Sequence, residues 1–347
     1  MTSADELYMR RALELAALGR NAASPNPMVG CVIVHNGVII GEGWHRQYGG
    51  PHAEVNAIRA VQNKSLLPQS RVYVTLEPCS HYGKTPPCAD LLINSGVRDV
   101  VICNTDPNPL VAGRGIKKMQ EAGIQVQTGL LEAQGLELNK RFFTFQNLKR
   151  PYIILKWAET ADGFLAGPAC ERIQISGKLA RRLVHKWRTE EQAIMVGTRT
   201  ALHDNPYLDT SHWPGRNPLR IVIDRKLQLS PHLHLFDGSQ PTLVYNYLKE
   251  EQAQEDLTFV QLQEQQDLLP QLFQDLYQRN VLSVLVEGGT YLLESLLQAN
   301  LWDEAFIFKN TDKTIGAGIK APAMVSGKLK QAQTFGSDLL FQFGNSE

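Results

Sequence analysis

The chain has 347 residues, of which 43% are hydrophobic, and its 35 basic and 35 acidic residues cancel. This length favours two domains over one. No cluster of Lys and Arg forms the cationic track that a nucleic-acid-binding protein needs for phosphates, so a small-molecule ligand is favoured.

The N-terminal segment reads as an amphipathic helix from residue 5 to residue 18. Asp5, Glu6 and Glu14 stand among its apolar positions, which is not the pattern of a secretion signal. No apolar stretch approaches the ~20 residues that span a bilayer. We therefore expect a soluble, cytoplasmic protein.

Residues 5 to about 145 alternate between helical and strand patterns. Two strands, 30–34 and 38–43, are joined by Asn36-Gly37, which is a strong hairpin signal. The elements that follow are a helix 53–61, a strand 72–76, a helix 88–93, a strand 100–103, a helix 116–122 and a strand 124–128. Such alternation predicts a sheet with helices on both faces.

A linker is expected at 147–151, which would separate a first domain, 1–147, from a second, 151–347. After Pro151 the pattern restarts. The predicted strands are 152–157, 193–196, 219–224, 242–245, 283–287, 304–309 and 339–343, and the predicted helices are 178–188, 268–279 and 291–298. The Gln- and Glu-rich segment 250–271 is expected to be a solvated surface.

Three residues in the first half form a pattern typical of a metal site. His52 precedes a predicted helix, Cys79 follows the end of a predicted strand, and Cys88 opens the next helix. A closed structural zinc site normally takes four protein ligands, whereas a catalytic site takes three and leaves the fourth position to water. The set of one imidazole and two thiolates therefore predicts a catalytic zinc site.

Glu54 stands two residues after the imidazole and is the candidate for proton transfer. Zinc lowers the pKa of a bound water to about 7, and a carboxylate beside the metal can act first as base and then as acid. We expect the positive end of the helix to keep this carboxylate ionised. The pattern is the signature of zinc-dependent nucleobase deaminases, except that eight residues rather than two separate the cysteines.

The other three cysteines carry no such signal. Five cysteines without a signal peptide argue against disulfides. Cys31 and Cys103 lie in apolar runs and are expected to be buried, whereas Cys170 lies in a loop.

With both halves in view, the chain resembles the bifunctional deaminase/reductase family of riboflavin biosynthesis over essentially its full length. The family's eight-residue separation of the two cysteines is present here. The motifs of the first half are SPNPMVG at 24–30, GWH at 43–45, HAE at 52–54, EPCSH with GKTPPC between 77 and 88, DPNP at 106–109 and AGRG at 112–115.

The resemblance implies a cytidine-deaminase-like three-layer αβα domain followed by a dihydrofolate-reductase-like α/β domain. The implied substrate is 2,5-diamino-6-(5-phosphoribosylamino)pyrimidin-4(3H)-one, which loses its C2 amino group. The residues expected to contact this substrate are Asn26, His45, His81 and Lys84. Asp106 and Asn108 either line the same crevice or cap a turn.

For the second half the resemblance implies hydride transfer from NADPH to ribose C1′, which opens the sugar to a ribityl chain. The segment VEGGT at 286–290 precedes a helix, so its glycines let backbone approach a phosphate at the helix N-terminus. Expected cofactor contacts are Thr200, Asp204, Gly289, Thr290 and Tyr291, and expected substrate contacts are Lys156, Arg182, Leu208 and Glu287.

The second half departs from the family pattern at two positions. A family tryptophan that contacts the cofactor becomes Gln174, and a family arginine that binds phosphate aligns with Ser211. Arg216 would substitute if its loop folds back. Hydride transfer depends on positioning the cofactor and substrate, so no single residue is named as its catalyst.

Three alternatives remain open. A nucleoside or guanine deaminase with an unrelated C-terminal domain would not oxidise NADPH with the deaminated intermediate. A degenerate reductase half that acts as a scaffold would not bind NADPH. A purely structural zinc protein would keep its activity after Glu54→Gln. The resemblance also implies a homo-oligomer.

Overall fold

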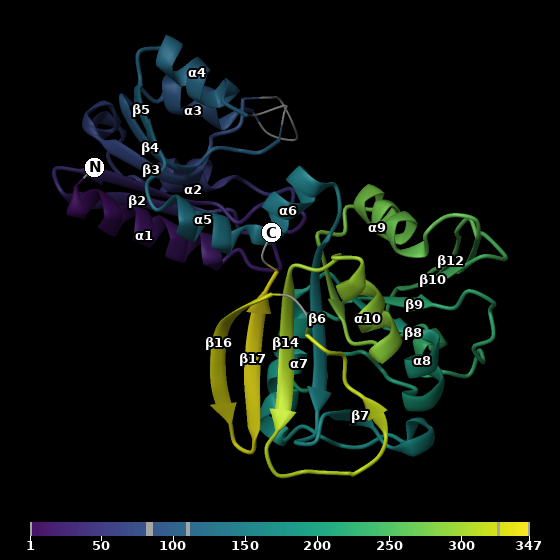
Figure 1. Cartoon of the computed structure of the whole chain (residues 1–347). Helices are drawn as coiled ribbons and strands as arrows, with labels where there is room; N and C mark the ends of the chain where they lie inside the picture. The colour runs from purple at the N-terminus through teal and green to yellow at the C-terminus, as the bar shows by residue number, and fades with distance from the viewer. Residues whose placement is uncertain (1, 81–85, 109–111, 325–326, 346–347) are drawn as a thin grey trace. The chain divides into compact units, whose positions relative to one another are not determined.

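The computed structural model describes residues 2–80, 86–108, 112–324 and 327–345 (Figure 1). The chain forms two compact units, residues 1–149 and 150–347. Within the described ranges, every helix is too short or too polar to cross a membrane.

The first unit is built on a five-stranded sheet with the order β2-β1-β3-β4-β5. Its strands are β1 (Gly30–His35), β2 (Val38–Trp44), β3 (Arg71–Leu76), β4 (Asp99–Asn104) and β5 (Gln125–Thr128). β1 is antiparallel to β2 and β3, whereas β3, β4 and β5 are parallel. The predicted hairpin is confirmed, with positive φ at both Asn36 and Gly37.

Helices cover both faces of this sheet, as predicted. They are α1 (Ser3–Ala17), α2 (Ala53–Ala60), α3 (Cys88–Asn94), α4 (Arg114–Glu121), α5 (Glu132–Leu138) and α6 (Lys140–Leu148), with a 3₁₀ turn at Lys64–Gln69. Val72 and Val74 of β3 pack with α2, α3 and α4, whereas Tyr73 between them packs with α1. This alternation follows from the two-residue period of a strand. Figure 1 shows α1 and α5 on one side of the sheet and α3 and α4 on the other.

The helix α1 is fixed at its start by Asp5, which is 4% exposed. Thr2 and Asp5 form a reciprocal capping box. The Asp5 carboxylate also accepts bonds from Arg71 Nη1 and the Tyr73 hydroxyl, both at 2.7 Å. One carboxylate therefore joins the helix to the central strand β3.

The second unit contains a ten-stranded sheet with the order β11-β12-β10-β9-β8-β13-β6-β14-β17-β16. In this sheet order, every strand from β12 through β14 is parallel to its neighbours within that stretch. The strands β11, β17 and β16 are antiparallel to their neighbours. Their bounds are β6 (Tyr152–Glu159), β8 (Ala193–Gly197), β9 (Leu219–Ile223), β10 (Thr242–Asn246), β11 (Glu251–Gln254), β12 (Leu257–Gln261), β13 (Ser283–Val286), β14 (Glu304–Asn310), β16 (Lys328–Phe335) and β17 (Asp338–Gly344). A separate ribbon pairs β7 (Phe164–Ala166) with β15 (Ile319–Lys320).

Helices also lie on both faces of the larger sheet. They are α7 (Lys178–Glu190), α8 (Thr198–Asp204), α9 (Leu268–Gln278) and α10 (Thr290–Gln298), with 3₁₀ turns at Pro168–Cys170 and His234–Phe236. Leu272 of α9 and Leu293 of α10 share one core. Ala201 of α8 and Val184 of α7 belong to other clusters with Ile194 and Phe308, respectively.

The segment 250–271 is largely exposed, as expected, and it also contains the unpredicted strands β11 and β12. The boundary between the two units falls within the expected linker 147–151, whose first two residues belong to the end of α6. Edge strands whose side chains face water, such as β11, lack the apolar alternation that predicts a strand.

Candidate functional site

The three predicted zinc ligands converge. The ligand atoms of His52, Cys79 and Cys88 all lie within 4.8 Å of one another. His52 Nδ1 is 3.6 Å from Cys79 Sγ and 3.3 Å from Cys88 Sγ. A tetrahedral zinc ion with ordinary bond lengths needs N···S edges of about 3.6 Å. The distances from the imidazole nitrogen to the two sulfurs are therefore close to those of a zinc site.

Local structure places these three ligands. His52 is the N-cap of α2, Cys79 follows β3, and Cys88 is the first residue of α3. The backbone N–H of Cys88 donates to Cys79 Sγ at 3.3 Å. Hydrogen bonding from Cys88, with a further bond from His52, lowers the pKa of Cys79 to about 4, which favours the thiolate that a metal requires.

Glu54 lies in the first turn of α2 and is 3% exposed. Burial raises the pKa of this carboxyl to about 6. The expectation that the helix end helps to hold Glu54 ionised stays a prediction, since a carboxyl with this pKa is still mainly ionised at pH 7. A carboxyl with a pKa near 6 is suited to accept a proton and return it near neutral pH.

Asn26 and His45, which the resemblance places at the substrate, bond to each other beside the metal cluster. Asn26 Nδ2 is 3.1 Å from His45 Nε2, and His45 Nδ1 is 3.1 Å from the Pro51 carbonyl oxygen. The carbonyl can only accept, so Nδ1 carries the hydrogen and Nε2 accepts from the amide. The His45 ring lies edge-on to His52, with centroids 5.4 Å apart. The other two expected contacts, His81 and Lys84, lie outside the described residues.

The role of Glu77, two residues before Cys79, is not evident from the sequence. Its side chain is buried and accepts four backbone N–H groups. Oε2 accepts from Asp106 at 3.3 Å and Gly113 at 3.0 Å, and Oε1 accepts from Gly115 at 3.0 Å and Ile116 at 3.3 Å. The carboxylate thereby fixes the start of α4 against the metal-binding segment.

The backbone around Glu77 leaves no room for a larger residue at position 115. A Cβ added to Gly115 would lie 2.1 Å from the Pro78 carbonyl oxygen. Nearby, the Asp106 carboxylate accepts the Asn108 N–H at 2.8 Å, which confirms the turn-capping interpretation of these two residues. A role in lining the substrate crevice stays a prediction.

The second unit holds a cavity of about 490 Å³. A volume of this size suits a small ligand. Four residues that sequence analysis assigned to ligands line it: Lys156, Asp204, Leu208 and Glu287. The cavity therefore gathers side chains from β6, from α8 and the loop after it, and from the end of β13.

Glu287 is held by two cations inside this cavity. Arg188 Nε and Nη2 donate to its two oxygens at 2.8 and 2.9 Å, and Lys156 Nζ lies 3.5 Å away. Burial acts to raise the pKa of Glu287, but the charges of Arg188 and Lys156 lower it to about 2. Glu287 is thus ionised and orients both cations.

Arg188, and not the expected Arg182, is among the residues that line this cavity. Arg181, Val184, His185 and Arg188 line the cavity, and their spacing puts them on one face of α7. Arg182 points elsewhere, with Cζ 6.0 Å from the centre of the Trp213 ring. The sequence does not say which face of α7 meets the cavity, so the choice between these arginines needed the fold.

Two of the expected cofactor residues bond to each other. The Gly289 N–H donates to Thr200 Oγ1 at 2.8 Å, and Thr290 Oγ1 donates to the Lys320 carbonyl. Tyr291, on the first turn of α10, is 68% exposed. A Cβ at Gly288 would lie 2.7 Å from the Leu292 side chain, so the turn packs closely against the start of α10. Such a turn suits the phosphates of a dinucleotide.

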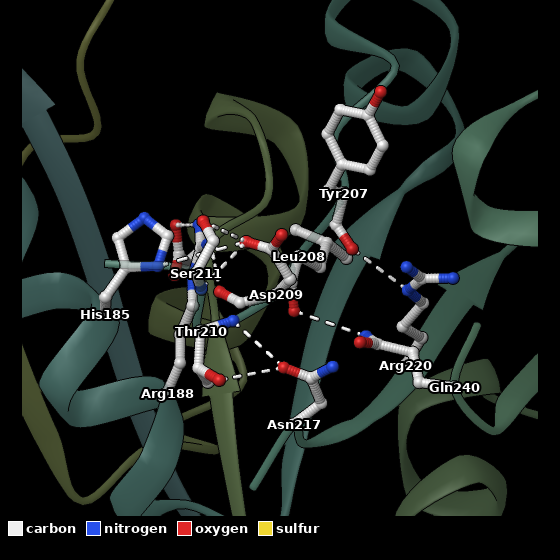
Figure 2. A network of polar contacts seen from close by, with 11 residues as sticks. His185, Arg188, Tyr207, Leu208, Asp209, Thr210, Ser211, Asn217, Arg220 and Gln240 are labelled. Carbon is white, nitrogen blue, oxygen red and sulfur yellow. Dashed lines mark hydrogen bonds and ion pairs between the residues drawn. The ribbon is translucent and has the colours of Figure 1, made fainter. Parts of the chain in front are cut away.

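Ser211 and its neighbours form the polar loop in Figure 2. Ser211 lines the cavity, and its hydroxyl is 3.1 Å from Asp209 Oδ1. Thr210 bonds through both its N–H and its hydroxyl to Asn217 Oδ1. The expected substitute Arg216 is not among the residues that line this cavity, and Gln174 is exposed.

Comparison with known proteins covers both units. Residues 151–341 match the family model described as RibD C-terminal domain, and residues 2–104 match the cytidine and deoxycytidylate deaminase zinc-binding region. The chain is 40% identical over 333 residues to riboflavin biosynthesis protein RibD of Bacillus amyloliquefaciens, covering 93% of this chain and 88% of that one. This chain belongs to the RibD family.

Solved structures of the family show the same architecture. A deaminase/reductase from Thermotoga maritima has a TM-score of 0.89 and 36% identity, with 99% of each chain covered. RibD from Acinetobacter baumannii also has a TM-score of 0.89, with 32% identity and 99% coverage of each chain. The expected fold class is confirmed: the chain is an enzyme of riboflavin biosynthesis with a zinc-binding deaminase half and an NADPH-dependent reductase half. The matches do not favour an unrelated or degenerate C-terminal half.

The remaining cysteines agree with expectation where the structure describes them. Cys31 and Cys103 are buried, and all five cysteines are free thiols. Cys170 is half-buried in a short 3₁₀ turn.

Proposed function

We propose that the first half removes the C2 amino group of 2,5-diamino-6-(5-phosphoribosylamino)pyrimidin-4(3H)-one. The second half then reduces the ribosyl group of the product to ribityl with NADPH. The observation that carries this proposal is the buried Glu54 beside a cluster of one imidazole and two thiolates. The boundaries proposed for the two catalytic halves are 1–147 and 151–347.

In the deaminase half, His52, Cys79 and Cys88 would hold zinc, which when bound would lower the pKa of a water molecule. Glu54 would accept a proton and pass it to the pyrimidine ring nitrogen and then to the departing amine. Asn26, held by His45, presents its amide to the edge of the pyrimidine ring. His81 and Lys84 contact the ring or the ribose phosphate.

In the reductase half, the residues bind and orient the reactants. Thr200, Asp204, Gly289, Thr290 and Tyr291 contact NADPH. The substrate lies against Lys156, Leu208 and Glu287. Arg182 is also proposed as a substrate contact, although Arg188 and not Arg182 lines the cavity. The ion pairs of Glu287 with Lys156 and Arg188 support this assignment, because they fix two cations in the cavity.

We also infer that the enzyme is a cytoplasmic homo-oligomer that acts on a small phosphorylated pyrimidine and not on nucleic acid. The exact balance of 35 basic and 35 acidic residues supports the last inference. Size-exclusion chromatography with light scattering measures the oligomeric state, and a monomer would contradict this part of the proposal.

The experiment that tests the proposal supplies the diaminopyrimidine and follows ammonia release and NADPH absorbance separately. We expect ammonia to be released when NADPH is absent. When NADPH is added, one NADPH should be oxidised for each ammonia released. Ammonia release without any NADPH oxidation would favour a deaminase with an inactive second half.

A further inference from the structure

Two histidines meet on the wall of the reductase cavity. His185 lies on α7 and His212 lies in the loop after α8, and their ring centroids are 4.6 Å apart. Both residues line the cavity. Within the described part of the chain neither imidazole makes a hydrogen bond, and Nδ1 of His185 is buried without a partner. Neither histidine has a role in the proposed function.

The charges around this pair leave a positive excess. Glu287 is already neutralised by Arg188 and Lys156. The structure shows no ion pair for Arg172 or Arg181 with another described residue. The charged residues that line the cavity are Lys156, Arg172, Arg181, Arg188, Asp204, Asp209 and Glu287.

His185 faces charged groups from three elements. Arg188 lies on its own helix, His212 and Asp209 come from the loop after α8, and Glu287 follows β13. The nearest acid is Asp209, whose Oδ1 is 3.9 Å from His185 Nδ1. Burial, followed by the charge of Arg188, lowers the pKa of His185 to about 4. This imidazole is therefore neutral near pH 7, because the attraction of Asp209 and Glu287 for its charged form does not offset burial and the charge of Arg188.

Both histidines stand next to groups that suit an anion. Figure 2 shows His185 and Arg188 extending from α7 toward the segment 209–211. Arg181 lies one turn before His185 on the same face of α7. A phosphate monoester offers three acceptor oxygens and nearly two negative charges at neutral pH, which matches imidazolium and guanidinium donors.

We propose that His185, His212 and Arg181 bind the phosphate group of the reductase substrate, and that the imidazole pair takes up a proton when the phosphate enters. This inference rests on the proposed function, because that function supplies a phosphorylated substrate. The histidine pair is a binding and positioning device; it touches the phosphate end of the substrate and not the carbon that receives hydride.

The proposal fixes the sign of a pH effect. A phosphate monoester is already dianionic above a pH of about 6 to 7, so its own charge changes little from pH 7 to pH 9. The bound dianion favours the imidazolium form, so proton uptake accompanies binding. Phosphate affinity must then fall as the pH rises over this window, because Arg side chains do not titrate there.

Calorimetric titration of the full zinc-loaded enzyme with methyl phosphate, a simple phosphate monoester, tests the site without turnover. We expect proton uptake, seen as a dependence of the heat on the buffer's ionisation enthalpy, and an affinity loss of about tenfold from pH 7 to pH 9. His185→Gln and His212→Gln should weaken binding at pH 7 by about tenfold and remove its pH dependence. His232→Gln alters an exposed histidine in the same unit and serves as the control.

A kinetic arm separates this site from the proposed function. In His212→Gln we expect KM for the phosphorylated substrate to rise about tenfold, while kcat and KM for NADPH stay as in the wild type. KM for a dephosphorylated substrate should be the same in both proteins. His212 is exposed, so this variant is expected to fold even if His185→Gln does not.

Two outcomes overturn the inference: phosphate affinity that is unchanged in a folded His212→Gln protein, or phosphate binding without proton uptake. A wild-type enzyme that shows the expected phosphate binding but never oxidises NADPH would instead contradict the proposed function and leave the anion site supported.

Discussion

The guanidinium of Arg188 and the carboxylate of Glu287 form two parallel hydrogen bonds, at 2.8 and 2.9 Å, inside the reductase cavity. Their side chains are 13% and 9% exposed. A pair of this kind is specific in geometry, because the planar fork of arginine matches the two carboxylate oxygens. Removing one member leaves the other charge buried.

Replacing Arg188 by alanine should destabilise the second unit by about 3 kcal/mol, because Glu287 keeps only the more distant Lys156. Arg188→Lys keeps the charge but loses the fork, so a smaller loss of about 1 kcal/mol is expected. Urea unfolding measures both changes. Reduction should fail in Arg188→Ala while ammonia release persists, and an unchanged unfolding midpoint would show that the pair contributes nothing.

The same pair predicts an acid sensitivity. The pKa of Glu287 falls from 4.5 to about 2 on folding, although burial alone would raise it, because Arg188 and Lys156 favour the ionised form. The stabilisation is therefore fully present above pH 4.5 and is lost as the pH falls toward 2. The free energy of unfolding of the wild type should drop between pH 5 and pH 3 more steeply than that of Glu287→Gln. Parallel curves would contradict the assignment.

Glu77 gives a prediction for the deaminase half. Glu77→Gln keeps one acceptor oxygen and leaves two of the four N–H groups without a partner, so the first unit should lose about 2 kcal/mol. Because the carboxylate fixes the segment that carries Cys79, zinc should also be lost faster to a chelator. Ammonia release should be reduced in this variant under conditions in which the first unit is still folded.

Gly115→Ala tests the same contact between the start of α4 and the segment that carries Cys79. The added Cβ would collide with the Pro78 carbonyl oxygen, so zinc should again be lost faster to a chelator. Glu121→Gln, on the exposed face of α4, is the matched control. Chelator release that is equally fast in Glu77→Gln and Glu121→Gln would show that Glu77 does not position the metal segment.

Asp5 predicts a third effect on stability. Burial acts to raise its pKa, but bonds from Tyr73, Thr2 and Arg71 hold the pKa well below its usual range. The stabilisation is present above about pH 4 and is lost under stronger acid. Asp5→Asn should cost about 2 kcal/mol at pH 7 and much less at pH 2, as measured by urea unfolding. A loss that is equal at both pH values would contradict this account.

The sequence predicted the metal cluster because its ligands sit at the ends of strongly patterned elements. His52 caps a helix, Cys79 follows the end of a strand and Cys88 opens a helix, so their spacing was informative. The role of Glu77 was not predicted, because its four hydrogen-bond partners lie 29 to 39 residues later in the chain. Nothing in the local pattern connects that carboxylate to the start of α4.

The second half was harder to predict for a different reason. The buried, apolar parallel strands from β10 to β14 in the sheet order were all expected. The strands β11, β12 and β16 were not expected, and the side chains of β11 and β16 are exposed. Arg182 was the expected substrate contact on α7, whereas Arg188 is the residue that lines the cavity. A helical pattern places both arginines, and only the packed sheet decides which one faces the cavity.

Glu54→Gln should separate the two activities. An amide cannot accept and return a proton, so ammonia release should fall by about 10²- to 10⁴-fold. Zinc content should stay at one ion per chain, since Glu54 is not a ligand. NADPH oxidation with the deaminated intermediate should continue at the wild-type rate, and undiminished ammonia release would contradict the role of Glu54.

The most direct test of the zinc site is the metal content of the purified enzyme, measured together with ammonia release in wild type and in Cys79→Ser. We predict one zinc ion per wild-type chain, and loss of both zinc and ammonia release in the variant, with NADPH oxidation of the deaminated intermediate retained. Ammonia release from a wild-type protein that contains no metal, or from a metal-free Cys79→Ser protein, would contradict the account.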